Sequence, residues 1–443
     1  MSETWLNMTA ADLGRGIGAG EIDPVDLTET FLAAIRAHAF TPRIYARLTE
    51  RRARAEASAA AARAKSGFRL GPLDGVPISW KDLFDTAGVG TEAGTALLQG
   101  RVPDRDAEVL RNATQAGLVC LGKTHMTELA FSGLGPNPVT ASPPNVNDHD
   151  AVSGGSSSGA ATSVAFGLAA AGIGSDTGGS VRIPSAWNDL VGLKTTSGRL
   201  SLNGVVPLCN SFDTVGPLCR TVEDAALLLA ALEGTKPVDL GATTLKGRKL
   251  AVLNSVAFDD IEDAPKAAFH NAVARLRVAG AEVVEVELDQ LHEMADLSAV
   301  LFATEAYGTW REVIEANPGK MFPQILERFQ GGRNVDAPTY VAGWRRLREI
   351  RAIWRARMAP YDAVLIPSCP IEPPNARRLD TEPEYFKRAN LLALRNTRIG
   401  NLMGSCALTL PTGIPSCGIM AMGLPDTEAA LLRLGLAMET ALA

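Results

Sequence analysis

The sequence AGIGSDTGGSVRIP occupies residues 171–184. Its first part, 171–175, predicts a short buried strand, and the glycine pair Gly178-Gly179 follows shortly afterwards. Two adjacent glycines allow the backbone to turn sharply and to point successive N–H groups into one concavity, where they can stabilise an oxyanion. Ser180 lies at the lip of this turn. We therefore interpret Ser180 as a candidate nucleophile, and the alternative is a solvated serine in a glycine-rich turn.

Helices and strands alternate on both sides of this segment. The alternation predicts an α/β layered fold with a largely parallel or mixed sheet. The chain shows no internal repeat, linker or low-complexity tract, so a single domain over residues 1–443 is predicted. The predicted strands are 75–80, 118–122, 171–175, 249–255 and 281–288, and the predicted helices are 50–65, 106–116, 159–170, 223–233 and 264–279.

Local signals predict further elements. Thr9 is a predicted N-cap of the first helix, and Asp23-Pro24 begins the second, with proline at the first helical position. The Ala-rich helix over 50–65 is expected to be exposed. The remaining predictions are long Arg-rich helices over 290–360, a Pro-rich loop over 366–385, and a strand, a turn and a helix after residue 408.

The composition is that of an ordinary globular protein. Apolar residues make up 46% of the 443 residues, charged residues make up 21%, and the net charge is −6. This acidic balance argues against nucleic acid as a partner, because phosphate binding normally needs a basic face. The six cysteines show no metal-binding spacing, so we expect no metal or cofactor and a reducing, cytoplasmic location. We also expect no signal peptide and no membrane partner.

A second serine-rich segment, SGGSSSG, occupies residues 153–159. It contains a G-x-S-x-G match, the pattern of a nucleophile elbow. An elbow needs an apolar strand before it, whereas the preceding sequence PPNVNDHDAVSG cannot form a central strand. An elbow also needs a later histidine, and only His270 and His292 follow, both in helix-like or polar surroundings. A mechanism based on histidine is therefore not favoured.

A serine nucleophile without histidine needs another base. Lysine can serve when burial or cationic neighbours lower its pKa toward neutrality. Lys81 lies at the end of the predicted strand GVPISW, residues 75–80, where partial burial is expected. Taken alone, Lys81 is compatible with an ordinary surface lysine. Its combination with the two serine-containing segments favours a catalytic role.

These segments together resemble the motifs of the amidase-signature family. The chain has WKD at 80–82, GGSSSG at 154–159, DTGGSVRIP at 176–184 and VGLKTTSGR at 191–199. GKTHMTELA at 122–130 and Asn401-Leu-Met-Gly404 resemble two further motifs of the family. The resemblance implies an amidase-signature fold, an α/β/α sandwich around a large mixed, twisted sheet. It divides the chain into a signature core over 65–235, a variable substrate-shaping region over 236–395 and a C-terminal part of the core over 396–443.

The resemblance also implies roles for individual residues. Ser180 matches the nucleophile, Lys81 the catalytic lysine, and Ser156 the intermediate serine, which follows a cis peptide bond in the family. The groups implied in substrate and transition-state binding are the backbone N–H groups of Thr177, Gly178, Gly179 and Ser180, as an oxyanion hole, and the carbonyl of Ala130. Structural roles are expected for Asp82 and Asp176, and Arg182 is expected either to orient the nucleophile loop or to form a structural ion pair.

The implied activity is hydrolysis of a small-molecule carboxylic amide to an acid and ammonia or an amine, by a homodimer. One alternative is the glutaminase subunit of a tRNA-dependent amidotransferase, but residues 394–401 lack the acidic residue that this subunit carries near its C-terminal Asn. A second alternative is a non-catalytic binding protein on the same scaffold, which the intact set of Lys81, Ser156 and Ser180 disfavours. Four aromatic residues are candidates for either an acyl pocket or the core: Phe302, Tyr307, Trp310 and Phe322.

Overall fold

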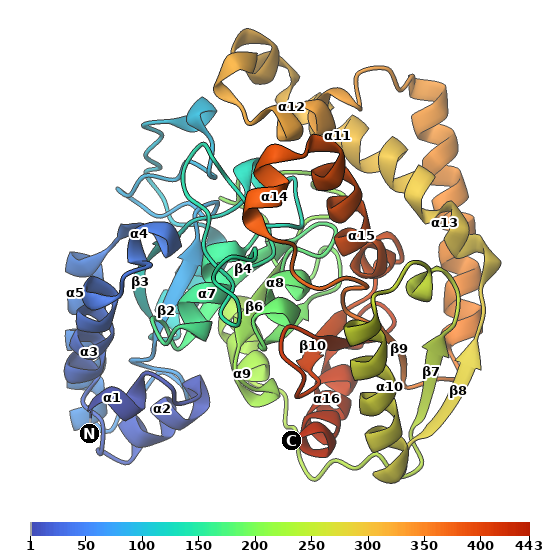
Figure 1. Cartoon of the computed structure of the whole chain (residues 1–443). Coiled ribbons are helices and arrows are strands. Elements are labelled where there is room, and N and C mark those ends of the chain that lie inside the picture. Colours follow the sequence, from blue (N-terminus) through green and yellow to red (C-terminus); the bar gives the residue numbers. More distant parts are fainter. Residues whose placement is uncertain (1) are drawn as a thin grey trace.

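The computed structural model describes residues 2–443, and a single sheet of eleven strands forms the centre of this part of the chain (Figure 1). The strands lie in the order β1-β3-β2-β4-β6-β5-β10-β11-β9-β7-β8. Their bounds are β1 Tyr45–Leu48, β2 Pro77–Lys81, β3 Val119–Thr124, β4 Ala171–Asp176, β5 Val191–Lys194, β6 Thr214–Cys219, β7 Lys249–Leu253, β8 Glu282–Val286, β9 Ala363–Pro367, β10 Ala407–Pro411 and β11 Gly418–Met422.

The sheet contains both parallel and antiparallel pairs. Strand β2 runs parallel to β3 and β4, and β7 runs parallel to β8 and β9. The central strands from β4 through β6, β5, β10 and β11 to β9 pair in antiparallel fashion, as does the edge strand β1 with β3. The predicted α/β fold with a mixed sheet is therefore confirmed.

Helices connect the strands and account for much of the remaining chain. Their bounds are α1 Ser2–Trp5, α2 Ala10–Gly18, α3 Pro24–Ala37, α4 Thr41–Ile44, α5 Glu50–Ser66, α6 Glu108–Gln115, α7 Ser158–Ala165, α8 Arg182–Trp187, α9 Val222–Glu233, α10 Asp263–Val278, α11 Met294–Ala316, α12 Pro323–Gln330, α13 Ala337–Met358, α14 Ala376–Thr381, α15 Pro383–Leu402 and α16 Glu428–Leu442. None of the helices in residues 2–443 combines the length and apolarity that a membrane crossing requires.

Helices cover the sheet on both faces. In β10, Leu408 contacts α16 close to Gly435, while its neighbour Thr409 pairs with Gly192 of β5. Gly192 faces Ser185 of α8. Because successive residues of a strand point to opposite faces, α8 and α16 lie on opposite sides of the sheet.

The helix starts that the sequence predicts are confirmed at the N-terminal end. Thr9 caps α2 by accepting a hydrogen bond from the backbone of Asp12, and Asp23 caps α3, which begins at Pro24. Helix α5 is also present, but it is only partly exposed, which corrects the expectation for 50–65. Its alanines at 53, 57, 60 and 61 are buried, and the helix packs against α3 and β3.

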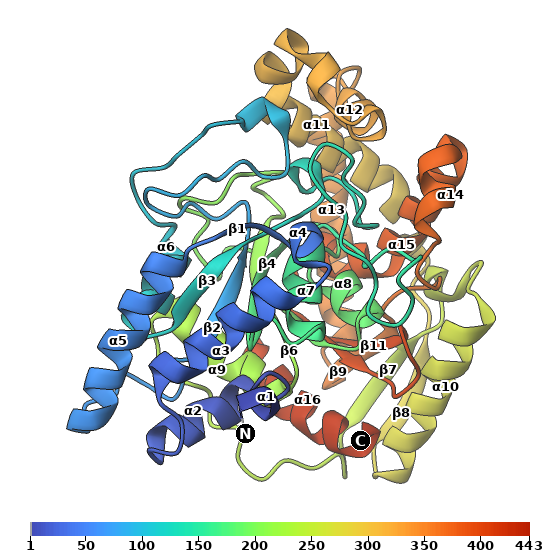
Figure 2. The ribbon, with the colours of Figure 1, turned by 60° about the vertical axis from the view of Figure 1, so that its left-hand side comes forward.

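The second half of the chain agrees with the predicted pattern except in one loop. Helices α11, α12 and α13 occupy most of residues 290–360, and Figures 1 and 2 show them on the far side of the molecule from α2, α3 and α5. The segment 366–385 is not a loop throughout, because α14 forms within it and α15 begins at Pro383. Asn375 caps α14, a local signal that the density of prolines hides.

Three strands escape prediction from the sequence. Strand β1 is four residues long, and β5 and β6 contain glycine or proline inside the strand. Both residue types are unfavourable in strands, and Pro217 cannot donate to a neighbouring strand. Strand β5 pairs only with Leu218 and Cys219 of β6, next to this proline. These strands form because the neighbouring strands and helices bury them.

We expect the replacement of Gly216 in β6 by alanine to destabilise the protein by about 3 kcal/mol or more, because overpacking of a rigid core forces the backbone apart. A Cβ atom at Gly216 would lie 1.9 Å from the backbone oxygen of Leu193. Gly308 in α11 is the matched control, because nothing lies within 4 Å of a Cβ atom there. Gly308→Ala should stabilise by about 0.5–1 kcal/mol. Denaturant unfolding measures both changes, and equal stability of the two variants would contradict the close packing.

Candidate active site

The carboxyl ends of β2 and β4 bring the first site residues together. These strands are parallel neighbours, with Ile78 opposite Ala171 and Trp80 opposite Ile173. Lys81 is the last residue of β2, and Ser175 and Asp176 end β4. Parallel strands end at the same edge of a sheet, which is where α/β proteins generally bind their ligands.

Lys81 is completely buried and surrounded by hydroxyl groups. Its Nζ atom donates to Ser156 Oγ at 2.7 Å, to Ser175 Oγ at 2.8 Å and to Ser157 Oγ at 3.1 Å. Burial lowers the pKa of Lys81 to about 7, although Asp176 and Asp213 oppose the shift. The lysine can therefore exchange a proton near neutral pH, and a bonded hydroxyl can donate to its neutral amine.

The serine-rich segment before α7 fits closely against two other loops. The Gly155–Ser156 peptide bond is cis, as the family resemblance implies. A Cβ atom at Gly155 would lie 2.6 Å from Thr127 Oγ1, so no larger residue fits there without movement. The backbone N–H of Ser157 donates to the carbonyl of Ser180 at 3.2 Å. This bond fixes the segment that carries Ser156 to the loop that carries Ser180.

The loop from Thr177 to Ser180 presents free backbone donors. Within residues 2–443, the four amides of this loop donate to no protein acceptor. Gly179 has a φ angle of 142°, a conformation that favours glycine, and a Cβ atom there would lie 2.1 Å from Thr397 Oγ1. The glycine therefore permits both the turn and the close approach of α15.

A buried ion pair holds this loop in place. Asp176 and Arg182 are both fully buried, and Arg182 Nη2 lies 2.9 Å from Asp176 Oδ1. Arg182 also donates to the carbonyl of Thr397 and to the side chain of Asn401 on α15, and Asp176 accepts from the backbone N–H of Val181. Burial raises the pKa of Asp176, but the guanidinium outweighs burial and holds it at about 2. Arg182 therefore joins the strand end, the loop and α15.

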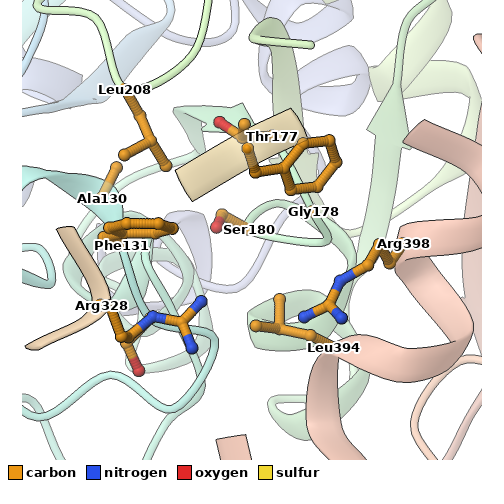
Figure 3. Close-up of a pocket in the computed structure, with 11 residues that line it drawn as sticks. Ala130, Phe131, Thr177, Gly178, Ser180, Leu208, Arg328, Leu394 and Arg398 are labelled. Atoms are coloured by element: carbon orange, nitrogen blue, oxygen red, sulfur yellow. The ribbon is translucent and has the colours of Figure 1, made fainter. Parts of the chain in front are cut away.

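A cavity of about 300 Å³ lies beside Ser180 (Figure 3). Apolar side chains dominate its wall, together with two arginines, and no Asp or Glu lines it within the described part of the chain. The residues that line the cavity are Ala130, Phe131, Ser132, Thr177, Gly178, Ser180, Leu208, Phe302, Arg328, Leu394 and Arg398. The cavity thus has room for a small acyl group next to the free amides.

The structure brings most of the predicted site residues together. Lys81 and Ser156 are hydrogen-bonded, and Ser180 and Ala130 border the cavity. Among the described residues, Ser180 Oγ forms no hydrogen bond with Ser156 Oγ, so this contact of the expected relay is not present. Of the four aromatic candidates, only Phe302 lines the cavity.

The other three aromatic residues belong to the surrounding packing. Trp310 Nε1 donates to the carbonyl of Pro207, the Tyr307 hydroxyl donates to Glu315, and Phe322 packs against Phe386. Sequence reasoning also missed several residues around the site: Phe131, Ser157, Ser175, Leu208, Asp213, Arg328 and Arg398. Only Ser157 and Ser175 carried a usable signal, because they lie inside the two motifs that the sequence singles out.

Comparisons with known proteins agree with this geometry. The family model described as Amidase matches residues 26–432. The chain belongs to the Amidase family. This amidase is 36% identical over 449 residues to a 2-amino-5-chloromuconic acid deaminase from Comamonas testosteroni, with 98% of this chain and 96% of the relative covered. A solved structure of an amidase shares 30% identity and a TM-score of 0.88, with 98% of this chain and 100% of the other covered.

The amidase is also similar to a protein whose name marks it as one part of a larger enzyme. The first subunit of the glutamyl-tRNA(Gln) amidotransferase from Chloroflexus aurantiacus is 32% identical over 471 residues, with 97% of this chain and 95% of the relative covered. The family match and these relatives confirm the resemblance drawn from the motifs. This amidase is a hydrolase that acts on C–N amide bonds.

The buried pair yields a stability prediction. Asp176→Asn leaves Arg182 charged and buried without its carboxylate, so the free energy of unfolding should fall by about 3–5 kcal/mol. Glu382→Gln is the matched control, because the Arg378–Glu382 pair is about half exposed on both sides and should contribute less than about 0.5 kcal/mol. Chemical denaturation distinguishes the two. An Asp176→Asn protein as stable as Glu382→Gln would show that the pair does not hold the loop.

Proposed function

We propose that this amidase hydrolyses a small-molecule carboxylic amide through an acyl-enzyme, with Ser180 as nucleophile, Ser156 as proton relay and Lys81 as base. The observation that carries the proposal is the 2.7 Å hydrogen bond between Lys81 Nζ and Ser156 Oγ. It lies in a fully buried site next to the loop of Ser180, and the lysine has a pKa of about 7.

The chemistry follows from these positions. Neutral Lys81 accepts the hydroxyl proton of Ser156, Ser156 accepts that of Ser180, and Ser180 Oγ forms a bond to the amide carbonyl carbon. The C–N bond then breaks, and the relay returns the proton to the leaving nitrogen. Water attacks the resulting ester while the relay takes up its proton, which releases the acid and restores Ser180. The Ser156–Ser180 contact forms in the substrate complex, because catalytic hydrogen bonds often tighten only there.

The free amides supply the electrostatic part of the mechanism. The N–H groups of Thr177, Gly178, Gly179 and Ser180 border the cavity where the carbonyl oxygen becomes an oxyanion, and the Ala130 carbonyl faces the same cavity as a substrate acceptor. One such donor contributes on the order of 10²–10³ in rate. Their rigidity, fixed by Asp176 and Arg182, is part of this contribution because no reorganisation is needed during the reaction.

The alternative function is that of a glutaminase subunit working with partner proteins, which the 32% identity to an amidotransferase component favours. The cavity supports the stand-alone function instead. The ammonium group of glutamine would find no carboxylate among the lining residues and would face the cationic side chains of Arg328 and Arg398. We therefore propose an enzyme that acts without other proteins, as a homodimer.

We expect the purified protein alone to release ammonia from at least one primary amide in a panel of short aliphatic, aromatic and ureido amides and glutamine. Ser180→Ala should lower the rate by about 10⁴-fold or more, because the covalent step is lost. Ser158→Ala is the matched control, since Ser158 lies in the same segment as Ser156 but does not contact Lys81. Activity restricted to glutamine and dependent on added partner proteins would favour the amidotransferase alternative.

The Lys81 pKa predicts the pH profile. The base must be neutral to act, so kcat/KM should fall about tenfold per pH unit below about pH 7 and level off above it. Burial also raises the pKa of Glu128 to about 7, and this residue is close to Ala130 in the sequence. Glu128→Gln is therefore the control. A profile that keeps its acidic limb in this variant assigns the limb to Lys81, and a limb that disappears assigns it to Glu128.

A further inference from the structure

Two arginines in the cavity have no acidic partner. Arg328 lies on α12 and Arg398 lies on α15, and Figure 3 shows both guanidinium groups directed into the cavity that holds Ser180. Neither forms an ion pair with a carboxylate among residues 2–443. Other well-buried guanidiniums of this protein do, such as Arg182 with Asp176.

Most N–H donors of these arginines are also unused. Arg398 is 7% exposed and donates from Nη1 to Ser298 Oγ at 2.9 Å, while its buried Nε has no acceptor in the described structure. The guanidinium of Arg328 stacks on Phe131, with 4.6 Å from its central carbon to the ring centroid, and its buried Nε is likewise without an acceptor. The phenyl ring fixes the plane of Arg328 and leaves its edge free for a ligand.

The arrangement is electrostatically unfavourable when the cavity is empty. Burial, together with the positive charge of Arg398, lowers the pKa of Arg328 to about 9. Burial lowers the pKa of Arg398 to about 10. Both groups remain cationic at neutral pH, so two positive charges share a poorly solvated space. An anion in this space would relieve the repulsion and accept the unused donors.

The rest of the wall determines which anion fits. Phe302, Leu208 and Leu394 separate the arginines from open solvent and offer apolar contacts to a short carbon chain. The planar guanidinium matches a carboxylate through two parallel hydrogen bonds. The arginines also line a neighbouring hollow of about 670 Å³, whose further wall includes Ala295, Ala299 and Gly331. An anion can therefore reach them from that side.

We propose that Arg328 and Arg398 bind a carboxylate on the acyl part of the substrate, so that the substrate is the monoamide of a short dicarboxylic acid. This inference rests on the proposed function of Ser180, since it places the amide at the loop 177–180 and the carboxylate at the two arginines. Arg398 and Arg328 are then specificity-determining residues, and Ser298 positions Arg398.

The test compares monoamides of dicarboxylic acids from malonic to adipic acid with neutral amides in which an isopropyl group replaces the carboxylate. In the wild type, kcat/KM should favour the best carboxylate by about 10²-fold or more, because its neutral counterpart leaves the arginines unpaired. Arg398→Met should remove about 10²-fold from the carboxylates and change the neutral amides by less than about threefold. Arg328→Met should act in the same direction.

Arg388→Met is the matched control, because Arg388 lies exposed on the same helix α15 and borders neither cavity. It should change neither substrate series. Equal losses on charged and neutral amides in Arg398→Met and Arg328→Met, or a wild-type enzyme without preference for carboxylates, would overturn the proposal while leaving the amidase mechanism intact.

A binding measurement separates this inference from the failure of the proposed mechanism. Calorimetry with malonate, succinate and glutarate on the Ser180→Ala protein requires no catalysis. Binding that is lost in Ser180→Ala combined with Arg398→Met supports the carboxylate site even when no amide is hydrolysed. Absence of binding for all three dicarboxylates, in a protein that is folded by circular dichroism, overturns it.

Discussion

The buried pair of Asp176 and Arg182 is the constraint on which the site depends. A charge pair without solvent is stable only when its hydrogen bonds are complete, and here Thr397, Asn401 and the backbone of Val181 complete them. These partners come from β4, from the loop after it and from α15. The pair therefore fixes the free amides of the loop relative to the sheet and to the helix that forms one wall of the cavity.

The two kinds of buried cation in the site differ in what burial does to them. Lys81 has a pKa of about 7, so it can lose its proton and act as a base among three hydroxyl groups. Arginine keeps its charge even when buried, so Arg328 and Arg398 can respond only by finding an anion. The same loss of solvent thus produces a proton acceptor at one end of the cavity and a fixed positive charge at the other.

The sequence predicts those features that depend on neighbouring residues in the chain. The capped starts of α2 and α3, the alternation of helix and strand, and the serine and lysine motifs are of this kind. Strand β6 was not predictable, because Gly216 and Pro217 disfavour a strand locally and only its partners stabilise it. Arg328 and Arg398 were equally hidden, because both lie in helices with many arginines and only the fold shows which of these lack an acidic partner.

Helix α15 has a consequence for how the substrate range of such an enzyme can change over evolution. On one helix, Thr397 and Asn401 support the nucleophile loop while Leu394 and Arg398 form the cavity wall. A shift of this helix to admit a new substrate would disturb the reaction machinery at the same time. Helices α11 and α12, which contribute Phe302 and Arg328, make no such contact with the pair. Inherited diversity should therefore accumulate in α11 and α12, and a designer seeking new substrates has the most freedom there.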